Sequence, residues 1–207
     1  MNWLALALMI PLGTPVAVHR EALAYLDARR YSEADNLCRS AVAGFEAVYG
    51  KDALEVALVL KDLAEAYRGE ADLTKAEEAS RRSIEIVEKK LGPEDANTAL
   101  GRDQLGEIYF DAHRYPEADR TLRASLATAE RALGTGHPHV ATILNDLAAV
   151  DFAQHRYTEA ESLYRRALAI REKQLGPGHP HVAVIRRNLA ELERARSGQP
   201  AVLALNR

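Results

Sequence analysis

Cysteine is almost absent from this sequence, because Cys38 is the only one among its 207 residues. A single cysteine excludes an internal disulfide and is too few for a thiolate zinc site. Glycine and proline are also sparse, at 12 and 8 residues. Because alanine, leucine, glutamate and arginine dominate instead, the composition favours helix over strand and predicts an all-α protein.

The sequence also lacks a strong excess of charge of one sign. Lys and Arg number 27 and Asp and Glu number 30, which gives a formal net charge of -3. No basic field is available to hold a phosphate backbone, so we expect no nucleic-acid partner. A content of 47% hydrophobic and 28% charged residues is typical of an ordered globular chain and excludes general disorder.

Residues 1–13 contain the main hydrophobic run, from Trp3 to Leu12. It has about ten residues where a membrane-spanning helix needs roughly twenty, so we expect no stable membrane anchor. The run is similar to the apolar region of a secretory signal cleaved after Ala17, although no Lys or Arg precedes it. The alternative is a segment that packs over the end of the first helix pair. The protein is expected to be exported or periplasmic in the first case and cytoplasmic in the second.

An internal repeat with a period of forty-two residues runs through the rest of the chain. It relates four glycines, four alanines, four arginines and four glutamates. These are Gly50, Gly92, Gly134 and Gly176; Ala34, Ala76, Ala118 and Ala160; Arg39, Arg81, Arg123 and Arg165; and Glu46, Glu88, Glu130 and Glu172. Such a period indicates that one supersecondary unit has been copied along the chain.

Each unit is predicted to form two helices. The repeated glycine suits the C-terminal cap of one helix, and Asp95, Pro138 or Pro180 marks the start of the next. Between the two helices of a unit, a hydroxyl followed three residues later by an acid predicts a capping box. This pattern places the N-caps of the second helices at Ser32, Thr74 and Thr158.

Helices that are amphipathic on one side cannot bury their apolar faces alone, so successive units must stack. We therefore predict an all-α, right-handed α-solenoid of about four antiparallel helix pairs with a C-terminal capping helix. The repeat domain spans 14–196, with units at 14–50, 51–92, 93–134 and 135–176, a capping helix at 177–196 and a tail at 197–207. The repeated alanines are expected where helices cross closely.

Two stretches of the repeat resemble the tetratricopeptide repeat family. Arg102-x2-Leu105-Gly106-x2-Tyr109 followed by Ala118-x3-Leu122 fits its pattern, and so does the stretch from Leu60 to Ala76. The longer unit, with Leu-Gly-Pro and Gly-His-Pro-His junctions, is similar to the variant of kinesin light chains. The resemblance implies a scaffold that binds other proteins or peptides. Asp151 departs from the pattern by replacing the tyrosine of earlier units.

Residues suited to chemistry are few. The histidines at 137, 139, 179 and 181 form two His-x-His pairs, but each is a copy of a turn residue and neighbours two apart point to different sides. Cys38 lies among apolar residues, and no motif links it to His19, so we predict that it is a core residue. We therefore expect no catalytic residue, no metal site and no cofactor, and we interpret the protein as a non-enzyme.

The candidate binding site is a row of side chains on the first helices, which line the concave groove in the proteins that this chain resembles. Its members recur once per unit outside the leucine core: Lys61, Glu65, Arg68, Asp103, Glu107, Phe110, Asn145, Phe152, Arg187 and Glu191. Phe110 and Phe152 are the strongest candidates, because exposed aromatics are enriched at binding hot spots. We expect a non-catalytic scaffold that binds a peptide segment or helix of another protein. The alternative is a structural or assembly module acting through self-association.

Overall fold

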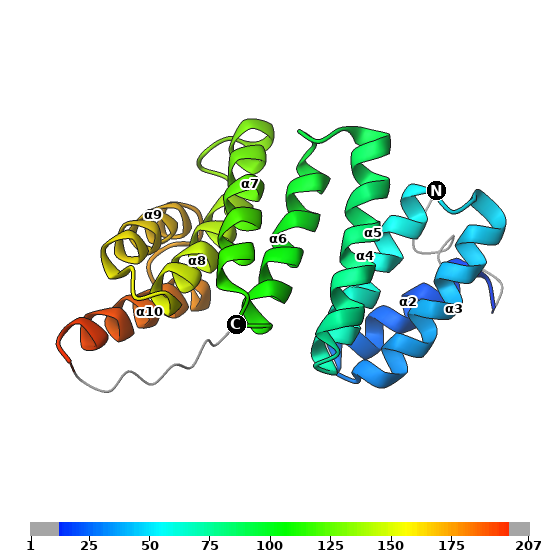
Figure 1. Ribbon diagram of the computed structural model, residues 1–207, viewed down its shortest axis with the longest axis horizontal. Helices are drawn as coiled ribbons and strands as arrows, with labels where there is room; N and C mark the ends of the chain where they lie inside the picture. The colour runs from blue at the N-terminus through cyan, green and yellow to red at the C-terminus, as the bar shows by residue number, and fades with distance from the viewer. Residues whose placement is uncertain (1–12, 199–207) are drawn as a thin grey trace. The chain divides into compact units, whose positions relative to one another are not determined.

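The computed structural model describes residues 13–198, and every regular element within that range is an α-helix (Figure 1). The all-α solenoid class is confirmed, since each helix packs against the next one along the chain within each of two compact units. The units divide after Gly92. The apolar run from Trp3 to Leu12 and most of the tail lie outside the described residues. Between residues 13 and 198, no helix is both long and apolar enough to cross a membrane.

The first unit contains two helix pairs. Their bounds are α2 Pro15–Asp27, α3 Tyr31–Tyr49, α4 Leu54–Gly69 and α5 Leu73–Leu91. The core lies between them and includes the fully buried Ala34 and Cys38 of α3 and Val56 of α4. The expected assignment of Cys38 to the core is therefore confirmed.

The second unit contains two further pairs and a final helix. Their bounds are α6 Ala96–Asp111, α7 Tyr115–Leu133, α8 Pro138–Ala153, α9 Tyr157–Leu175 and α10 Pro180–Arg196. Helix α8 is the most buried, with ten buried residues, whereas α10 buries only Val182, Ile185 and Leu192. The final helix is therefore more solvated, as a capping helix should be.

The repeated glycines close the second helix of each pair. Gly50, Gly92, Gly134 and Gly176 are the C-cap residues of α3, α5, α7 and α9, with φ between 81° and 95°. This left-handed region favours glycine because it has no Cβ. The first helices α6, α8 and α10 then begin after the N-caps Asp95, His137 and His179, as the sequence predicts.

The predicted capping boxes are wrong. The second helices begin after Arg30, Asp72, Arg114 and Arg156, so Ser32, Thr74 and Thr158 lie inside the first turn rather than at the N-cap. The residue before each of these N-caps has a positive φ of 56–62° although none is glycine. This tight turn, which the sequence does not signal, brings the chain into the second helix earlier than expected.

Stacking is similar in all four repeats. The alanines at 34, 76, 118 and 160 are fully buried, in agreement with close helix crossings.

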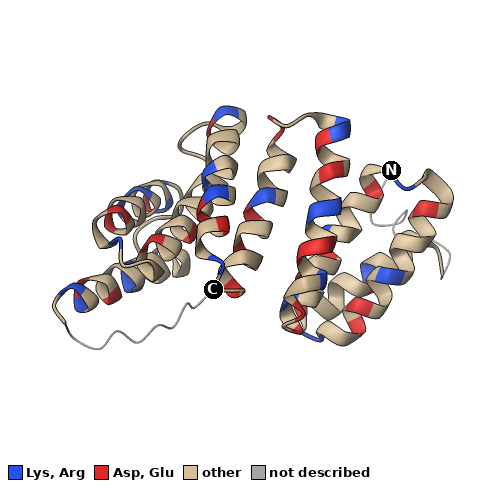
Figure 2. Ribbon diagram, in the orientation of Figure 1, with Lys and Arg blue, Asp and Glu red and all other residues tan. Residues whose placement is uncertain are grey.

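Each repeated arginine pairs with the acid four residues earlier, at 2.9, 2.9, 3.0 and 2.7 Å along the chain. Acidic and basic side chains accordingly alternate along the second helices within each unit (Figure 2). Such exposed pairs contribute only about 0.3–0.5 kcal/mol each.

Candidate functional site

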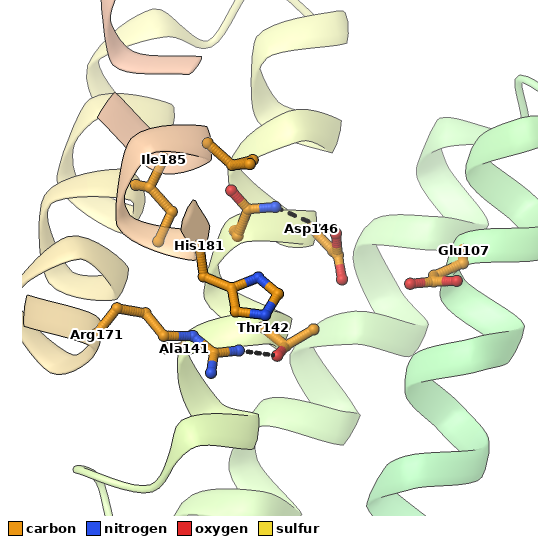
Figure 3. Close-up of a pocket in the computed structure, with 9 residues that line it drawn as sticks. Glu107, Ala141, Thr142, Asp146, Arg171, His181 and Ile185 are labelled. Atoms are coloured by element: carbon orange, nitrogen blue, oxygen red, sulfur yellow. Dashed lines mark hydrogen bonds between the residues drawn. The ribbon is translucent and has the colours of Figure 1, made fainter. Parts of the chain in front are cut away.

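A cavity of about 230 Å³ lies among the helices of the second unit (Figure 3). Its walls come from the first helices α6, α8 and α10 and from the second helix α9. The lining residues are Glu107, Ala141, Thr142, Asn145, Asp146, Arg171, His181, Val184 and Ile185. Two predicted groove residues, Glu107 and Asn145, are thus brought together by the fold.

Polar side chains link successive first helices within each unit. In the second unit, the Asn188 amide of α10 donates to Asn145 Oδ1 of α8 at 3.0 Å. At the same repeat positions in the first unit, His19 Nε2 of α2 lies 2.7 Å from Asp62 Oδ2 of α4, and Asp62 Oδ1 also lies 3.1 Å from Lys61 Nζ of its own helix. Neighbouring repeats therefore hold these side chains in place, which lowers the conformational entropy lost when a ligand binds.

Arg171 is the principal cation of the cavity. Its Nη2 donates to Thr142 Oγ1 at 2.6 Å. Within residues 13–198, no carboxylate oxygen lies within the 4.0 Å of an ion pair from this guanidinium. Burial lowers the pKa of Arg171, and the negative charge of Asp146 opposes that effect. The cavity therefore contains a half-buried positive charge without a paired counter-ion.

Asp103 does not lie on an exposed row, which corrects the sequence prediction. Its residue is only 7% exposed, and His139 Nδ1 of the next first helix lies 3.8 Å from Asp103 Oδ2. Burial lowers the pKa of His139, and the nearby charges of His137 and Arg171 lower it further. The His139 ring is therefore neutral at pH 7 and covers the carboxylate by packing.

The expectation that Phe110 is exposed is also wrong. Phe110 is 7% exposed, and its ring centroid lies 5.5 Å from that of Tyr115. Phe152 is half-buried in the same way against Tyr157, at 5.6 Å. The tyrosine that begins each following helix covers the aromatic ring, a contact that a count along the first helix alone does not reveal. Phe110 is consequently a core residue rather than an anchor for a ligand.

The other predicted residues are spread over both units and do not line the cavity. In the first unit, Lys61 and Arg68 are half-buried and Glu65 is exposed on α4. On α10, Arg187 is exposed and Glu191 forms an ion pair with Arg194 at 2.9 Å. These residues occupy the predicted first helices.

Sequence reasoning missed an apolar row, the one polar residue that interrupts it, and a second polar replacement on the second helices. Val16, Leu58 and Leu100 occupy one repeat position and are 41%, 53% and 43% exposed. Thr142 takes that position in the fourth repeat, and Val184 takes it in α10. Arg171 likewise replaces residues that are apolar in the three earlier repeats. Comparison of each repeat position across all copies would have found both departures.

The described residues offer little for catalysis. Cys38 is fully buried, and burial, with the nearby charge of Asp62, raises the pKa of its thiol to about 12. His137 and His179 accept backbone hydrogen bonds from His139 and His181 at 3.2 Å, so they act as helix caps. Over residues 13–198, no three His, Cys, Asp or Glu side chains are grouped to hold a metal ion.

Comparisons with known proteins agree with this geometry. The tetratricopeptide repeat model matches residues 16–89, 94–173 and 140–204. No curated protein matches the sequence.

Several solved structures share the fold. A Podosopora anserina protein named for the kinesin light chain, with nearly identical TPR-like repeats, is 23% identical with a TM-score of 0.74, over 92% of this chain and 90% of that one. BtubC (BKLC) from P. vanneervenii is 21% identical with a TM-score of 0.77, over 93% and 78%. A Rap protein in complex with Competence and Sporulation Factor is 16% identical with a TM-score of 0.74, over 92% and 51%.

The family model covers most of the chain. The chain therefore belongs to the tetratricopeptide repeat family, with repeats like those of kinesin light chains.

Proposed function

We propose that this protein is a non-catalytic scaffold that binds a peptide segment or helix of another protein on its first helices. The observation that carries the proposal is the cavity of the second unit, where Glu107, Asn145 and Val184 come from three different first helices. Tetratricopeptide repeats commonly serve as protein-interaction scaffolds, and a ligand that touches several repeats gains contacts from each.

The exposed apolar row supports the same proposal. Leu58 and Leu100 lie on first helices and are 53% and 43% exposed. A residue that packs between stacked helices would be buried instead. Within the first unit, Val16 and Leu58 take this position on the successive first helices α2 and α4, so a partner that lies across both helices gains two apolar contacts. The solved Rap protein with its bound factor shows that a similar fold can hold a ligand, and we extend that property to this chain as part of the proposal.

Selection of displayed random peptides on the immobilised full-length protein tests this proposal, followed by fluorescence anisotropy on the tightest peptide. Asn145→Ala should weaken binding by about 1–3 kcal/mol, because Asn145 lies on the cavity wall. Glu85→Lys, on the exposed side of second helix α5, is the matched control and should leave the affinity unchanged. Peptides that bind equally well to Asn145→Ala but not to Glu85→Lys would place the site on the second helices instead.

Self-association is the second candidate function, and the distribution of exposed apolar side chains favours it. Of the nine large apolar residues that are exposed within residues 13–198, seven lie in the first unit, including Val16 and Leu23 on α2. A second copy of the chain could cover this helix and extend the stack. Sedimentation equilibrium separates the two functions: a dimer that Leu23→Lys converts to a monomer supports assembly, and a monomer at all concentrations removes it.

A further inference from the structure

The loops that join successive repeats carry an acid that pairs with a base of the following second helix. In the first unit, Asp52 of the loop between α3 and α4 forms an ion pair with Lys89 of α5. In the second unit, Glu94 of the loop between α5 and α6 lies 2.7 Å from Arg131 Nη1 of α7. The two acids are forty-two residues apart and so are the two bases, so this contact is part of the repeat.

The next copy of this contact has a base but no acid. Lys173 of α9 takes the position of the two bases, whereas Gly136 of the loop between α7 and α8 takes the position of the two acids. Among residues 13–198, no carboxylate oxygen lies within the 4.0 Å of an ion pair from Lys173 Nζ. The fourth repeat therefore keeps the cation but lacks the counter-ion that the loop supplies to the earlier copies.

A hollow of about 570 Å³ lies between this loop and α9, and both Gly136 and Lys173 line it. The Gln174 amide donates a hydrogen bond to the Gly136 carbonyl, which ties the loop to the helix. Ala169 and Ile170 add an apolar part to the wall. The hollow thus combines a cation, a held loop and an aliphatic surface on the outer side of the second unit.

One positive charge in the hollow has no partner among the described residues. Arg166 also lines the hollow, but its guanidinium donates to Glu130 of α7, just as Arg82 donates to Glu46 in the first unit. That pair is closed inside the fold. Lys173 is exposed and its ammonium group offers three donors. A single net positive charge is matched by a single negative charge, which favours a carboxylate over a dianionic phosphate.

We infer that the hollow between Gly136 and Lys173 is a docking site for an acidic side chain of a partner protein, whose carboxylate takes the place of the missing loop acid. The carboxylate pairs with Lys173, and the methylene groups of the same side chain contact Ile170. The site lies on a loop and a second helix, so it is separate from the first-helix surface of the proposed function. Neither surface is tested by the experiment designed for the other.

Backbone amide nuclear magnetic resonance of the full-length protein tests the site with small probes at constant ionic strength. The probes are N-acetylglutamate amide, the neutral N-acetylglutamine amide and inorganic phosphate. We expect saturable shifts at the amides of Gly136 and Gln174 with the glutamate probe and none with the glutamine probe. Lys173→Gln should abolish these shifts, and Lys173→Arg should retain them because the charge is kept.

Returning an acid to the loop is the sharpest variant. A Cβ at Gly136 would meet no atom within 4 Å, and Gly136 is not among the residues with a positive φ, so Gly136→Asp fits without strain. The new carboxylate should pair with Lys173, as in the earlier repeats, and the glutamate probe should no longer shift the Gln174 amide. Gly178→Asp is the matched control, because it changes the same loop position one repeat later, where the space is equally open. It should leave the response unchanged.

Three results would overturn the docking site. These are the absence of a saturable response to the glutamate probe, a response that survives Lys173→Gln, and equal responses in Gly136→Asp and Gly178→Asp. A saturable response to inorganic phosphate that exceeds the response to the glutamate probe would overturn the carboxylate in favour of a phosphorylated ligand.

Discussion

The third and fourth repeats have the same arrangement of helices but differ in the side chains that pack between them. At the corner between helices, Tyr109 of the third repeat lies under the Arg114 guanidinium, 4.5 Å from the ring centroid. In the fourth repeat Asp151 replaces the tyrosine and accepts a hydrogen bond from Arg156 Nε at 2.9 Å. The arginine is kept while its partner changes from an aromatic ring to a carboxylate.

The cavity shows a second change of the same kind. Ala129 and Leu100 of the third repeat become Arg171 and Thr142 in the fourth. The two polar replacements differ in outcome. Arg156 also binds Asp119 of α7 at 2.7 Å, whereas Arg171 donates to the Thr142 hydroxyl and is influenced by the charge of Asp146 without forming an ion pair among the described residues. The comparison teaches that a polar group placed inside a copied repeat can join a network of ion pairs, as Arg156 does, or keep a single hydroxyl partner, as Arg171 does.

Removing the Arg156 side chain at the turn between α8 and α9 should produce the largest loss of stability. Arg156→Ala leaves the fully buried Asp151 without its main partner, so we expect the free energy of unfolding to fall by about 3 kcal/mol. Arg114→Ala removes the cation–π contact with Tyr109 and a partly exposed ion pair with Glu117 at 3.0 Å, and it should cost about 1 kcal/mol. Urea denaturation of the full chain measures both. Equal losses would show that the two corners are energetically alike despite their different partners.

Enlarging the stacking position should cost the same in both repeats. Ala118 and Ala160 are fully buried, and leucine at either position should lower the free energy of unfolding by about 1–3 kcal/mol through overpacking. Ala132→Leu, on the exposed side of α7, is the control and should change little. Thermal denaturation that finds the control as damaging as Ala118→Leu would contradict the assigned helix crossing.

A change of pH should have a smaller effect on the free energy of unfolding. Burial raises the pKa of Asp151 more than its hydrogen bond from Arg156 lowers it. A carboxyl with a raised pKa in the folded state contributes stability below its ordinary pKa and loses that contribution as the pH rises through the folded value. The stability of the wild type relative to Asp151→Asn should therefore decrease from acidic to neutral pH. A difference that increases with pH would show that the ion pair dominates instead.

The smallest change in stability is expected at Arg171. Arg171→Met removes a half-buried charge that forms no ion pair within residues 13–198, so the free energy of unfolding should stay within about 0.5 kcal/mol of wild type or rise. The midpoint of urea denaturation checks this. A loss comparable with that of Arg156→Ala would mean that Arg171 supports the fold rather than a ligand.

The period of forty-two residues is enough to predict the helices, because the glycines and helix starts that define them are local signals. It does not predict the entry into the second helices, where Arg29 and His113 adopt a positive φ without glycine. The candidate site was predicted less well. Phe110 and Asp103 are covered by Tyr115 and His139, which come from other helices, so their burial depends on packing that a pattern along one helix does not contain.

Mapping a selected peptide onto the protein by backbone amide chemical shifts tests the central claim most directly. If first helices bind the partner, saturation with the peptide should shift amides of α8 and α10 around Asn145 and Val184, and leave the exposed side of α9 around Arg165 unchanged. Shifts confined to the exposed sides of α7 and α9, with the amides around Asn145 unmoved, would contradict the account.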